Sequence, residues 1–285
     1  MEGIVTSSEY LHKTIKDYDN NNTLTYNERS IYNEVCIIVN NWFNYTYKNY
    51  YGCNSAYSIY NNFSTATLEI QQSGSRAKGT AIKGSSDLDM FLSITDRENE
   101  DTLKEYYNGL YDYLKRNGYN VRKQNVSIGL KYKGMEIDLV PAKKCNSQSY
   151  QRLYERFNDH YLWSNKKQAR TLTNIQKHID LIRNSNARNE IMLTKIWRNR
   201  FNLDFPSIYI ELMIIDALRN FNEYDIEKRF LHVLYYIRDN IMDKKIVDPS
   251  NGQNIISDTL SYSEKLAIKN KANESINARY WSEVV

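Results

Sequence analysis

The chain has 285 residues, of which 41% are hydrophobic and 25% charged, and its formal net charge at pH 7 is +4. Because domains commonly hold roughly 100–200 residues, we expect two fused lobes. No apolar run approaches the ~18 residues that a membrane span needs, and the first residues lack the pattern of a signal peptide. We therefore expect a soluble, cytoplasmic protein that does not associate with membranes.

Cysteine and histidine do not predict a metal site. The cysteines are Cys36, Cys53 and Cys145. They form no CxxC pair or Cys/His cluster, so we expect free thiols and no structural zinc. His160, His178 and His232 also lack ligand spacing, and we expect them to be structural or surface groups.

The first half of the chain predicts a mixed α/β lobe. Apolar residues at three- and four-residue steps in 25–43 predict a long N-terminal helix. Strands are predicted at 68–72 and 87–94, and a helix at 99–117. Three further strands are predicted at 119–124, 126–132 and 135–140, with Gly134 marking a hairpin turn between the last two.

The second half predicts helices only. Helical patterns cover 150–160, 171–184, 187–201, 207–221, 225–242 and 262–281, interrupted by FPS at 205–207 and DPSNGQN at 248–254. The class is therefore α+β, with a mixed-sheet lobe at 1–141, a helical lobe at 142–285 and a boundary near Pro141. Residues 141–220 hold more Lys and Arg than Asp and Glu. This positive charge could bind polyphosphate or nucleic acid, or it could belong to an ordinary solvated helical surface.

The segment SGSRAKGTAIKGSSDLDMFLSI at 73–94 places two carboxylates in a strand that is otherwise apolar. A period of two puts Asp87 and Asp89 on one face of this strand, opposite its apolar residues. The alternative is a surface turn with solvated carboxylates. The apolar strand and the Gly-Ser pair upstream argue against that alternative.

A third carboxylate, Asp138, lies in the strand GMEIDLVPA. If strands 86–94 and 135–140 are neighbours, Asp87, Asp89 and Asp138 meet at one point. Oxygen ligands suit Mg²⁺ or Mn²⁺, and two such ions could bridge a triphosphate, activate a hydroxyl and neutralise departing pyrophosphate. Gly74 and Ser75 would bind phosphate through backbone amides and a hydroxyl, although no Walker A loop is present.

These motifs resemble a known family. G-S followed by G-x-S-D-x-D on a strand, with a third Asp on a later strand, resembles the DNA polymerase β-like nucleotidyltransferases. The longer match, GTAIKGSSDLD with EIDLVPA, resembles the branch that holds oligoadenylate synthases, cyclic GMP-AMP synthase and the bacterial CD-NTases (the cGAS/DncV-like family). The resemblance continues through LTKIWRNRFNLDFPSIYIELMIIDAL and DPSNGQN, and covers residues 68–281.

The resemblance implies a polymerase β-like lobe, a helical lobe and an active site in the cleft between them. It implies that Lys195 and Ser207 contact the triphosphate. The alternative for Lys195 is an ordinary lysine with a buried aliphatic stem, and the alternative for Ser207 is a helix N-cap. The family often has an aromatic residue directly after this serine. Here that residue is Ile208, which leaves Tyr209, one position later, as the candidate for stacking on a base.

The acceptor side of the site is predicted in the segment 121–132. Gln124, Asn125 and Ser127 offer hydrogen bonds to a base or ribose. These polar residues are equally consistent with an exposed strand edge that binds no nucleotide.

The expected function is a template-independent, Mg²⁺-dependent nucleotidyltransferase that joins nucleoside triphosphates, ATP among them. The expected product is a cyclic di- or trinucleotide second messenger, made with release of pyrophosphate in bacterial anti-phage (CBASS) signalling. The alternatives are a linear oligoadenylate-type synthase, an RNA- or tRNA-end nucleotidyltransferase, and a binding module without catalysis, which the intact carboxylates disfavour. We expect a monomer whose product activates an effector protein. We expect no zinc-dependent DNA sensing, because the scattered cysteines cannot build a zinc insertion.

Overall fold

The computed structural model describes residues 7–20, 23–48, 66–84, 87–95, 102–145 and 158–285. The chain divides into two compact units. The sheet unit comprises Thr23–Arg76 and Asp87–Gln176, and the helical unit comprises Met1–Asn22, Ala77–Ser86 and Lys177–Val285. Each unit is described by itself below.

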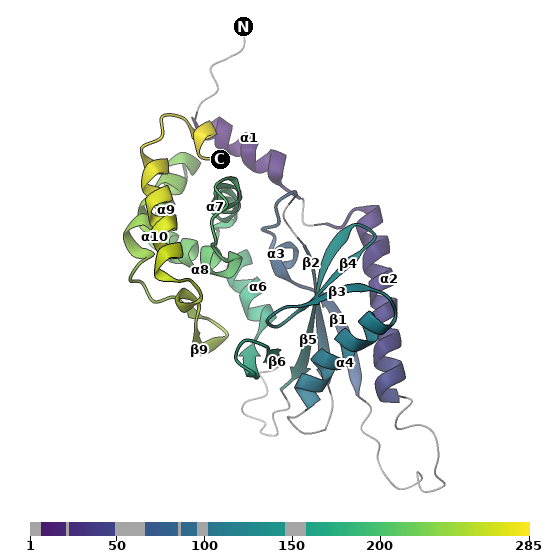
Figure 1. The fold of residues 1–285 in the computed structure, drawn as a ribbon. Coiled ribbons are helices and arrows are strands. Elements are labelled where there is room, and N and C mark those ends of the chain that lie inside the picture. The colour runs from purple at the N-terminus through teal and green to yellow at the C-terminus, as the bar shows by residue number, and fades with distance from the viewer. Residues whose placement is uncertain (1–6, 21–22, 49–65, 85–86, 96–101, 146–157) are drawn as a thin grey trace, which may run out of the picture. The chain divides into compact units, whose positions relative to one another are not determined.

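Within its described residues, the sheet unit holds a seven-stranded mixed sheet (Figure 1). The order is β1-β2-β5-β4-β3, and β6 pairs with both β5 and β7. Only the pair β2 and β5 is parallel among these strands. The strands are β1 (Thr67–Gln72), β2 (Leu88–Thr95), β3 (Asn120–Lys123), β4 (Ile128–Tyr132), β5 (Met135–Lys144), β6 (His160–Ser164) and β7 (Ala169–Thr173).

Two helices, α2 (Tyr26–Phe43) and α4 (Thr102–Arg116), pack on one face of this sheet. Thr25 and Glu28 form a capping box that starts α2, and the π-helical turn η1 (Asn44–Lys48) follows that helix. Alternate residues of β2 and β5 join the helices in one buried cluster, so the residues between them face the opposite side of the sheet. That opposite side carries the predicted carboxylates.

The helical unit surrounds α8, whose sequence SIYIELMIIDAL is apolar on nearly all sides. The elements of this unit are α1 (Ser7–Tyr18), α6 (Ile175–Arg183), α7 (Arg188–Arg200), α8 (Ser207–Leu218), α9 (Ile226–Asn240), β8 (Val247–Asp248), β9 (Asn251–Ile255), η3 (Ile256–Thr259), α10 (Tyr262–Ile276) and η4 (Trp281–Glu283). The short helix α3 (Gly74–Lys78) lies where the chain leaves the sheet unit for the helical unit. None of the described helices is long and apolar enough to cross a membrane.

A buried charge cluster lies inside the helical unit. The Glu211 side chain is fully buried, and its two oxygens each lie 2.8 Å from an ammonium nitrogen, Oε1 from Lys195 and Oε2 from Lys78. Lys195 also donates to the Thr80 hydroxyl at 2.8 Å. Burial by itself raises the pKa of Glu211, but the charges of Lys78 and Lys195 outweigh it and lower that pKa to about 2. Glu211 is therefore a buried carboxylate with two cationic partners.

The strands predicted in the first half are present, with shifted ends, and the predicted N-terminal helix corresponds to α2. The first predicted helix of the second half needs correction. Its residues 150–157 lie outside the described residues, whereas residue 160 begins β6, and β7 occupies the start of the helix predicted from 171. Both segments are short strands that join the sheet beyond β5.

The predicted boundary at Pro141 falls inside β5. Pairing of β5 with β4 ends at Leu139, and pairing with β6 starts at Ala142. Pro141 thus lies between two partner strands, where a missing N–H donor is tolerated. The helix α1, predicted as part of the first lobe, belongs to the helical unit.

Replacing Glu211 by Gln should lower the free energy of unfolding by about 3–5 kcal/mol, because the buried ammonium group of Lys195 and the partly buried one of Lys78 lose their counter-charge. Urea unfolding followed by circular dichroism measures the change. Glu274→Gln is the matched control, since the Glu274 side chain is 62% exposed, and it should cost less than about 0.5 kcal/mol. Equal costs for the two variants would contradict this account of the cluster.

The contribution of Glu211 should also depend on pH. Its pKa lies below the ordinary value of 4.5, so the stability it contributes is present above that pH and is lost as the pH falls toward 2. The difference in unfolding free energy between the wild type and Glu211→Gln should be constant above about pH 5 and shrink below it. A difference that stays constant down to pH 2.5 would show that Glu211 is not held ionised by the lysines.

Candidate functional site

The pairing of the strands builds a row of residues across one face of the sheet. Asp89 of β2 lies directly beside Asp138 of β5 in the parallel register. Asp138 in turn lies opposite Gly129 of β4, and Gly129 lies opposite Arg122 of β3. Directly paired residues point to the same face of a sheet. The predicted adjacency of the two aspartate-bearing strands is therefore confirmed.

Asp87 precedes Asp89 by two residues and adds a third carboxylate beside this row. Partial desolvation and then the charge of Glu136 raise the pKa of Asp87. Burial and then the charge of Asp87 raise the pKa of Asp138. The positive charge of Arg122 opposes both shifts. The carboxyl groups are thus close enough to disfavour each other's ionisation.

Gly74 lies directly against the Asp89 carboxylate. Its φ is +64°, and a Cβ at this position would lie 1.7 Å from Asp89 Oδ2. The Ser73 amide donates to the Asp89 carbonyl oxygen at 2.9 Å, which fixes the chain just before Gly74. Ser75 follows in the first turn of α3. Gly74 and Ser75, predicted to bind phosphate, are therefore next to one of the predicted metal ligands.

Gln124 and Asn125 lie in the turn between β3 and β4 and have different surroundings. Gln124 lies beside Asp138. Its neighbours assign the orientation of its amide, with the oxygen toward the Arg122 donors and the nitrogen toward Asp138, to whose two oxygens it donates at 3.1 and 3.2 Å. The Asn125 side-chain oxygen accepts from the Ser164 hydroxyl at 2.9 Å and from the Lys166 amide at 3.0 Å. Asn125 thus ties the turn to the end of β6, whereas Gln124 faces the carboxylates.

The carboxylates offer the hard oxygen ligands that Mg²⁺ and Mn²⁺ prefer. Within the part of the chain that the structure describes, no three His, Cys, Asp or Glu side chains are gathered closely enough to bind one ion as they stand. The Asp89 carboxylate lies against Gly74, and Ser127 donates to Asp138 at 3.4 Å. A divalent cation at Asp87, Asp89 and Asp138 therefore stays a prediction.

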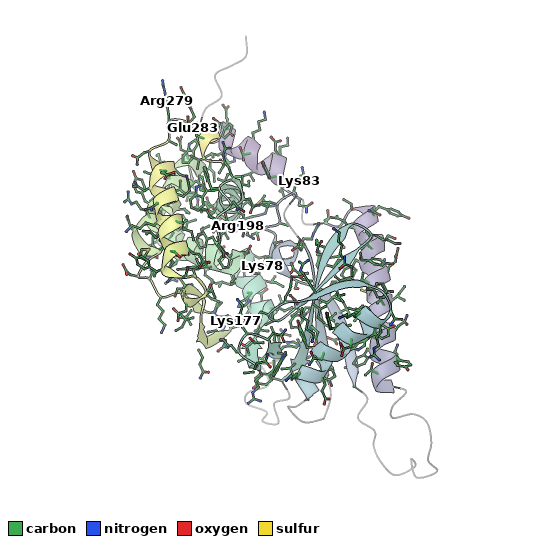
Figure 2. The ribbon with its side chains drawn as sticks, viewed as in Figure 1. Lys78, Lys83, Lys177, Arg198, Arg279 and Glu283 are labelled. Carbon is green, nitrogen blue, oxygen red and sulfur yellow. The ribbon has the colours of Figure 1, made fainter. Side chains whose placement is uncertain are left out.

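The helical unit carries the predicted triphosphate ligands Lys195 and Ser207. Lys195 is 2% exposed and is paired with Glu211, and burial lowers the pKa of its ammonium group. Ser207 is the first residue of α8, after Pro206 at the N-cap position, and its hydroxyl accepts from Arg198 at 3.0 Å. Figure 2 labels Lys78 and Arg198, two cations of this region that we did not single out in the sequence.

Tyr209 is a core residue in the structure. Its ring is 0% exposed and packs edge-on against Phe205, with the ring centroids 5.2 Å apart. Burial raises the pKa of its hydroxyl to about 12. The prediction that Tyr209 stacks on a base is corrected on this point, because neither face of its ring is open to a nucleotide.

His160, His178 and His232, predicted to be structural or surface groups, make contacts within the fold. His160 bonds the Ser93 hydroxyl at 2.7 Å, His178 bonds Asp248 at 2.7 Å, and His232 stacks on a phenylalanine ring. Cys36 and Cys145 are free thiols, and Cys53 lies outside the described residues.

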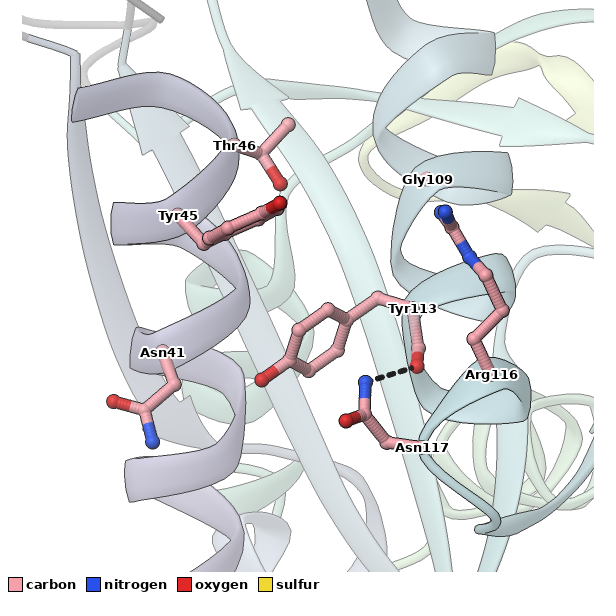
Figure 3. A pocket seen from close by; sticks show the side chains of 7 residues that line it. All are labelled: Asn41, Tyr45, Thr46, Gly109, Tyr113, Arg116 and Asn117. Atoms are coloured by element: carbon pink, nitrogen blue, oxygen red, sulfur yellow. Dashed lines mark hydrogen bonds between the residues drawn. The ribbon is translucent and has the colours of Figure 1, made fainter. Parts of the chain in front are cut away.

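A pocket of ≈ 850 Å³ lies between α2 and α4 in the sheet unit (Figure 3). Its lining residues are Asn41, Tyr45, Thr46, Gly109, Tyr113, Arg116 and Asn117. These two helices pack on the face of the sheet opposite the aspartate row, and the lining contains no carboxylate. The pocket is therefore separate from the candidate site.

Comparison with known families places a nucleotidyltransferase in this chain. Residues 53–167 match the family described as the Second Messenger Oligonucleotide or Dinucleotide Synthetase domain. This span contains Gly74, the three aspartates and the turn at Gln124. No curated protein sequence shows a significant match to the chain.

Several solved structures share the fold over most of the chain. Escherichia coli MS115-1 CdnC with ATP is 18% identical, with a TM-score of 0.69 and coverage of 96% of this chain and 91% of that one. Bradyrhizobium diazoefficiens CdnG, a CD-NTase in complex with GTP, is 11% identical, with a TM-score of 0.66 and coverage of 95% and 89%. Vibrio cholerae DncV, a cyclic AMP-GMP synthase, is 12% identical, with a TM-score of 0.57 and coverage of 74% and 63%.

The mixed sheet with flanking helices and the helical C-terminal region form a polymerase β-like nucleotidyltransferase fold. The predicted family is also confirmed. The sequence of residues 53–167 and the fold of the chain both support the cGAS/DncV-like CD-NTase family.

Gly74→Ala should lower the free energy of unfolding by about 2 kcal/mol, because alanine is strained at positive φ and its Cβ collides with Asp89. Urea unfolding measures this cost. Gly252→Ala is the control, since no atom lies within 4 Å of a Cβ built there. Equal stability of the two variants would show that Gly74 is not confined by Asp89.

Proposed function

We propose that the chain is a template-independent, metal-dependent nucleotidyltransferase that joins nucleoside triphosphates into a cyclic oligonucleotide and releases pyrophosphate. The observation that carries this proposal is the register of β2 and β5, which sets Asp89 beside Asp138 with Gly74 against the same carboxylate. The family domain covers all of these residues.

Asp87, Asp89 and Asp138 are the proposed ligands of two divalent cations, Mg²⁺ or Mn²⁺. Bound cations of this kind neutralise phosphate charge and lower the pKa of an attacking hydroxyl. Burial raises the pKa values of Asp87 and Asp138, and the charge of Glu136 on Asp87 and of Asp87 on Asp138 raises them further. Bound cations would balance this negative charge.

Gly74 and Ser75 are proposed to hold a phosphate group of the donor nucleotide. Glycine at positive φ leaves the backbone open to close approach, and the Ser75 amide and hydroxyl are donors for phosphate oxygens. These donors lie next to the Asp89 carboxylate, so they would fix the phosphate beside a metal ligand.

Lys195 and Ser207 remain the predicted triphosphate ligands of the helical unit. What supports them is the charge of their surroundings: Lys78, Lys195 and Arg198 face a single carboxylate, Glu211. A phosphate would compete with Glu211 for the lysine ammonium groups. The N-terminus of α8, where Ser207 lies, also favours an anion.

The family domain supports a second-messenger product, and the relatives DncV, CdnC and CdnG are described as a cyclic AMP-GMP synthase and as complexes with ATP and GTP. For this chain we propose a cyclic di- or trinucleotide used in anti-phage signalling. ATP as a substrate, an effector protein activated by the product, the acceptor roles of Gln124 and Asn125, and a cytoplasmic monomer also stay predictions.

Asp87→Asn, Asp89→Asn and Asp138→Asn should each reduce product formation by about 100-fold or more, because bound metal supplies several kcal/mol of charge stabilisation. Incubation with labelled nucleoside triphosphates and Mg²⁺, followed by mass spectrometry, measures the product. Asp239→Asn removes an exposed carboxylate that pairs with Arg238, and it should keep the wild-type rate. A folded Asp89→Asn variant that turns over like the wild type would overturn the site.

The product should resist phosphatase, because a cyclic oligonucleotide has no terminal phosphate. Mass spectrometry before and after phosphatase treatment tests this property. A phosphatase-sensitive ladder would favour a linear oligoadenylate-type synthase, and nucleotides added to RNA ends would favour a tailing enzyme.

A further inference from the structure

The Arg122 side chain lies across Gly129 in the row that contains Asp138. A Cβ built on Gly129 would lie 2.9 Å from Arg122 Cγ, 2.9 Å from Nε and 3.1 Å from Cζ. Any side chain at position 129 would therefore meet the length of the arginine. Because Gly129 has no side chain, Arg122 can lie across β4 from β3 toward β5, with its side chain 56% exposed.

Two partners hold the Arg122 guanidinium in this position. Its Nη1 donates to Glu136 of β5 at 2.8 Å. Its Nη2 and Nε lie 3.1 and 3.3 Å from the Gln124 amide oxygen. A planar guanidinium presents several donors in a fixed fork, so it can bind a carboxylate and an amide oxygen at the same time.

Gln124 connects Arg122 to Asp138 through hydrogen bonds. When its amide oxygen faces Arg122, its amide nitrogen faces Asp138 and donates to both carboxylate oxygens, at 3.2 Å to Oδ1 and 3.1 Å to Oδ2. The positive guanidinium decides which end of the amide points to the carboxylate. With the amide reversed, an oxygen would face Asp138 and repel it.

We propose that Arg122, seated across Gly129, is a positioning residue that orients Gln124 and, through it, the Asp138 carboxylate. This inference rests on the proposed function, in which Asp138 binds a divalent cation. Groups that hydrogen-bond a metal-binding carboxylate fix its orientation, and their loss commonly costs about 10- to 100-fold in metal affinity or activity. Arg122 needs no contact with the cation or the nucleotide for this role.

Two variants distinguish the effect of the position of Arg122 from the effect of its charge. Gly129→Ala keeps Arg122 but displaces it, because the added Cβ would lie 2.9 Å from its Cγ and Nε. Arg122→Lys keeps the positive charge but lacks the fork that binds Glu136 and Gln124 together. Lys123→Ala is the matched control, because Lys123 is the next residue of β3, points to the other face and donates to Asn108 at 2.7 Å.

The experiment measures Mn²⁺ binding by electron paramagnetic resonance and the rate of nucleotide joining as a function of Mg²⁺ concentration. Circular dichroism first shows that each variant is folded. Arg122→Lys and Gly129→Ala should each raise the Mn²⁺ dissociation constant at least threefold and lower the maximal rate about tenfold. Lys123→Ala should stay within about twofold of the wild type in both measurements.

A double variant tests whether Gly129 acts through Arg122. Because Gly129→Ala works by displacing the arginine, it should add less than about a twofold effect in the Arg122→Ala background. If Gly129→Ala had its full single-variant effect in the Arg122→Ala background as well, the proposal would be overturned. Wild-type Mn²⁺ affinity in both Arg122→Lys and Gly129→Ala would also overturn it. A wild-type protein that binds Mn²⁺ but makes no oligonucleotide would count against the proposed function instead, and the Mn²⁺ titrations would still decide the role of Arg122.

Discussion

The parallel pairing of β2 with β5 is the constraint on which the candidate site depends. It sets Asp89 beside Asp138, although the two residues are far apart in the sequence. The opposite faces of the same strands bury Leu88 and Leu139 under α2 and α4. A slip of one residue would turn these side chains to the wrong faces and would separate the carboxylates. The hydrophobic core of the sheet unit therefore fixes the geometry of the polar face.

The two units hold local charge clusters of opposite sign. In the sheet unit, several carboxylates share one face, with Arg122 among them. In the helical unit, Lys78 and Lys195 surround the single carboxylate of Glu211. Carboxylates in excess attract metal cations, and ammonium groups in excess attract phosphate.

Local periodicity was enough to place the aspartates, because an alternating strand leaves no other face for Asp87 and Asp89. It could not place β6 and β7, which are short segments that gain their stability by pairing with β5 and with each other. Tyr209 was assigned from its position after Ser207, whereas the packing of α8 turns its ring into the core. The pairing of Lys195 with Glu211 and the contact of Arg122 with Gly129 depend on tertiary structure that no local pattern contains.

The central claim is that Asp87, Asp89 and Asp138 together bind divalent cations. Anomalous diffraction from crystals grown with Mn²⁺ and a non-hydrolysable ATP analogue tests it most directly. The account predicts anomalous peaks within ligand distance of all three carboxylates, beside the backbone of Gly74. Well-diffracting crystals that contain the bound analogue, but show no peak at these residues or show the Mn²⁺ at another site, would contradict it.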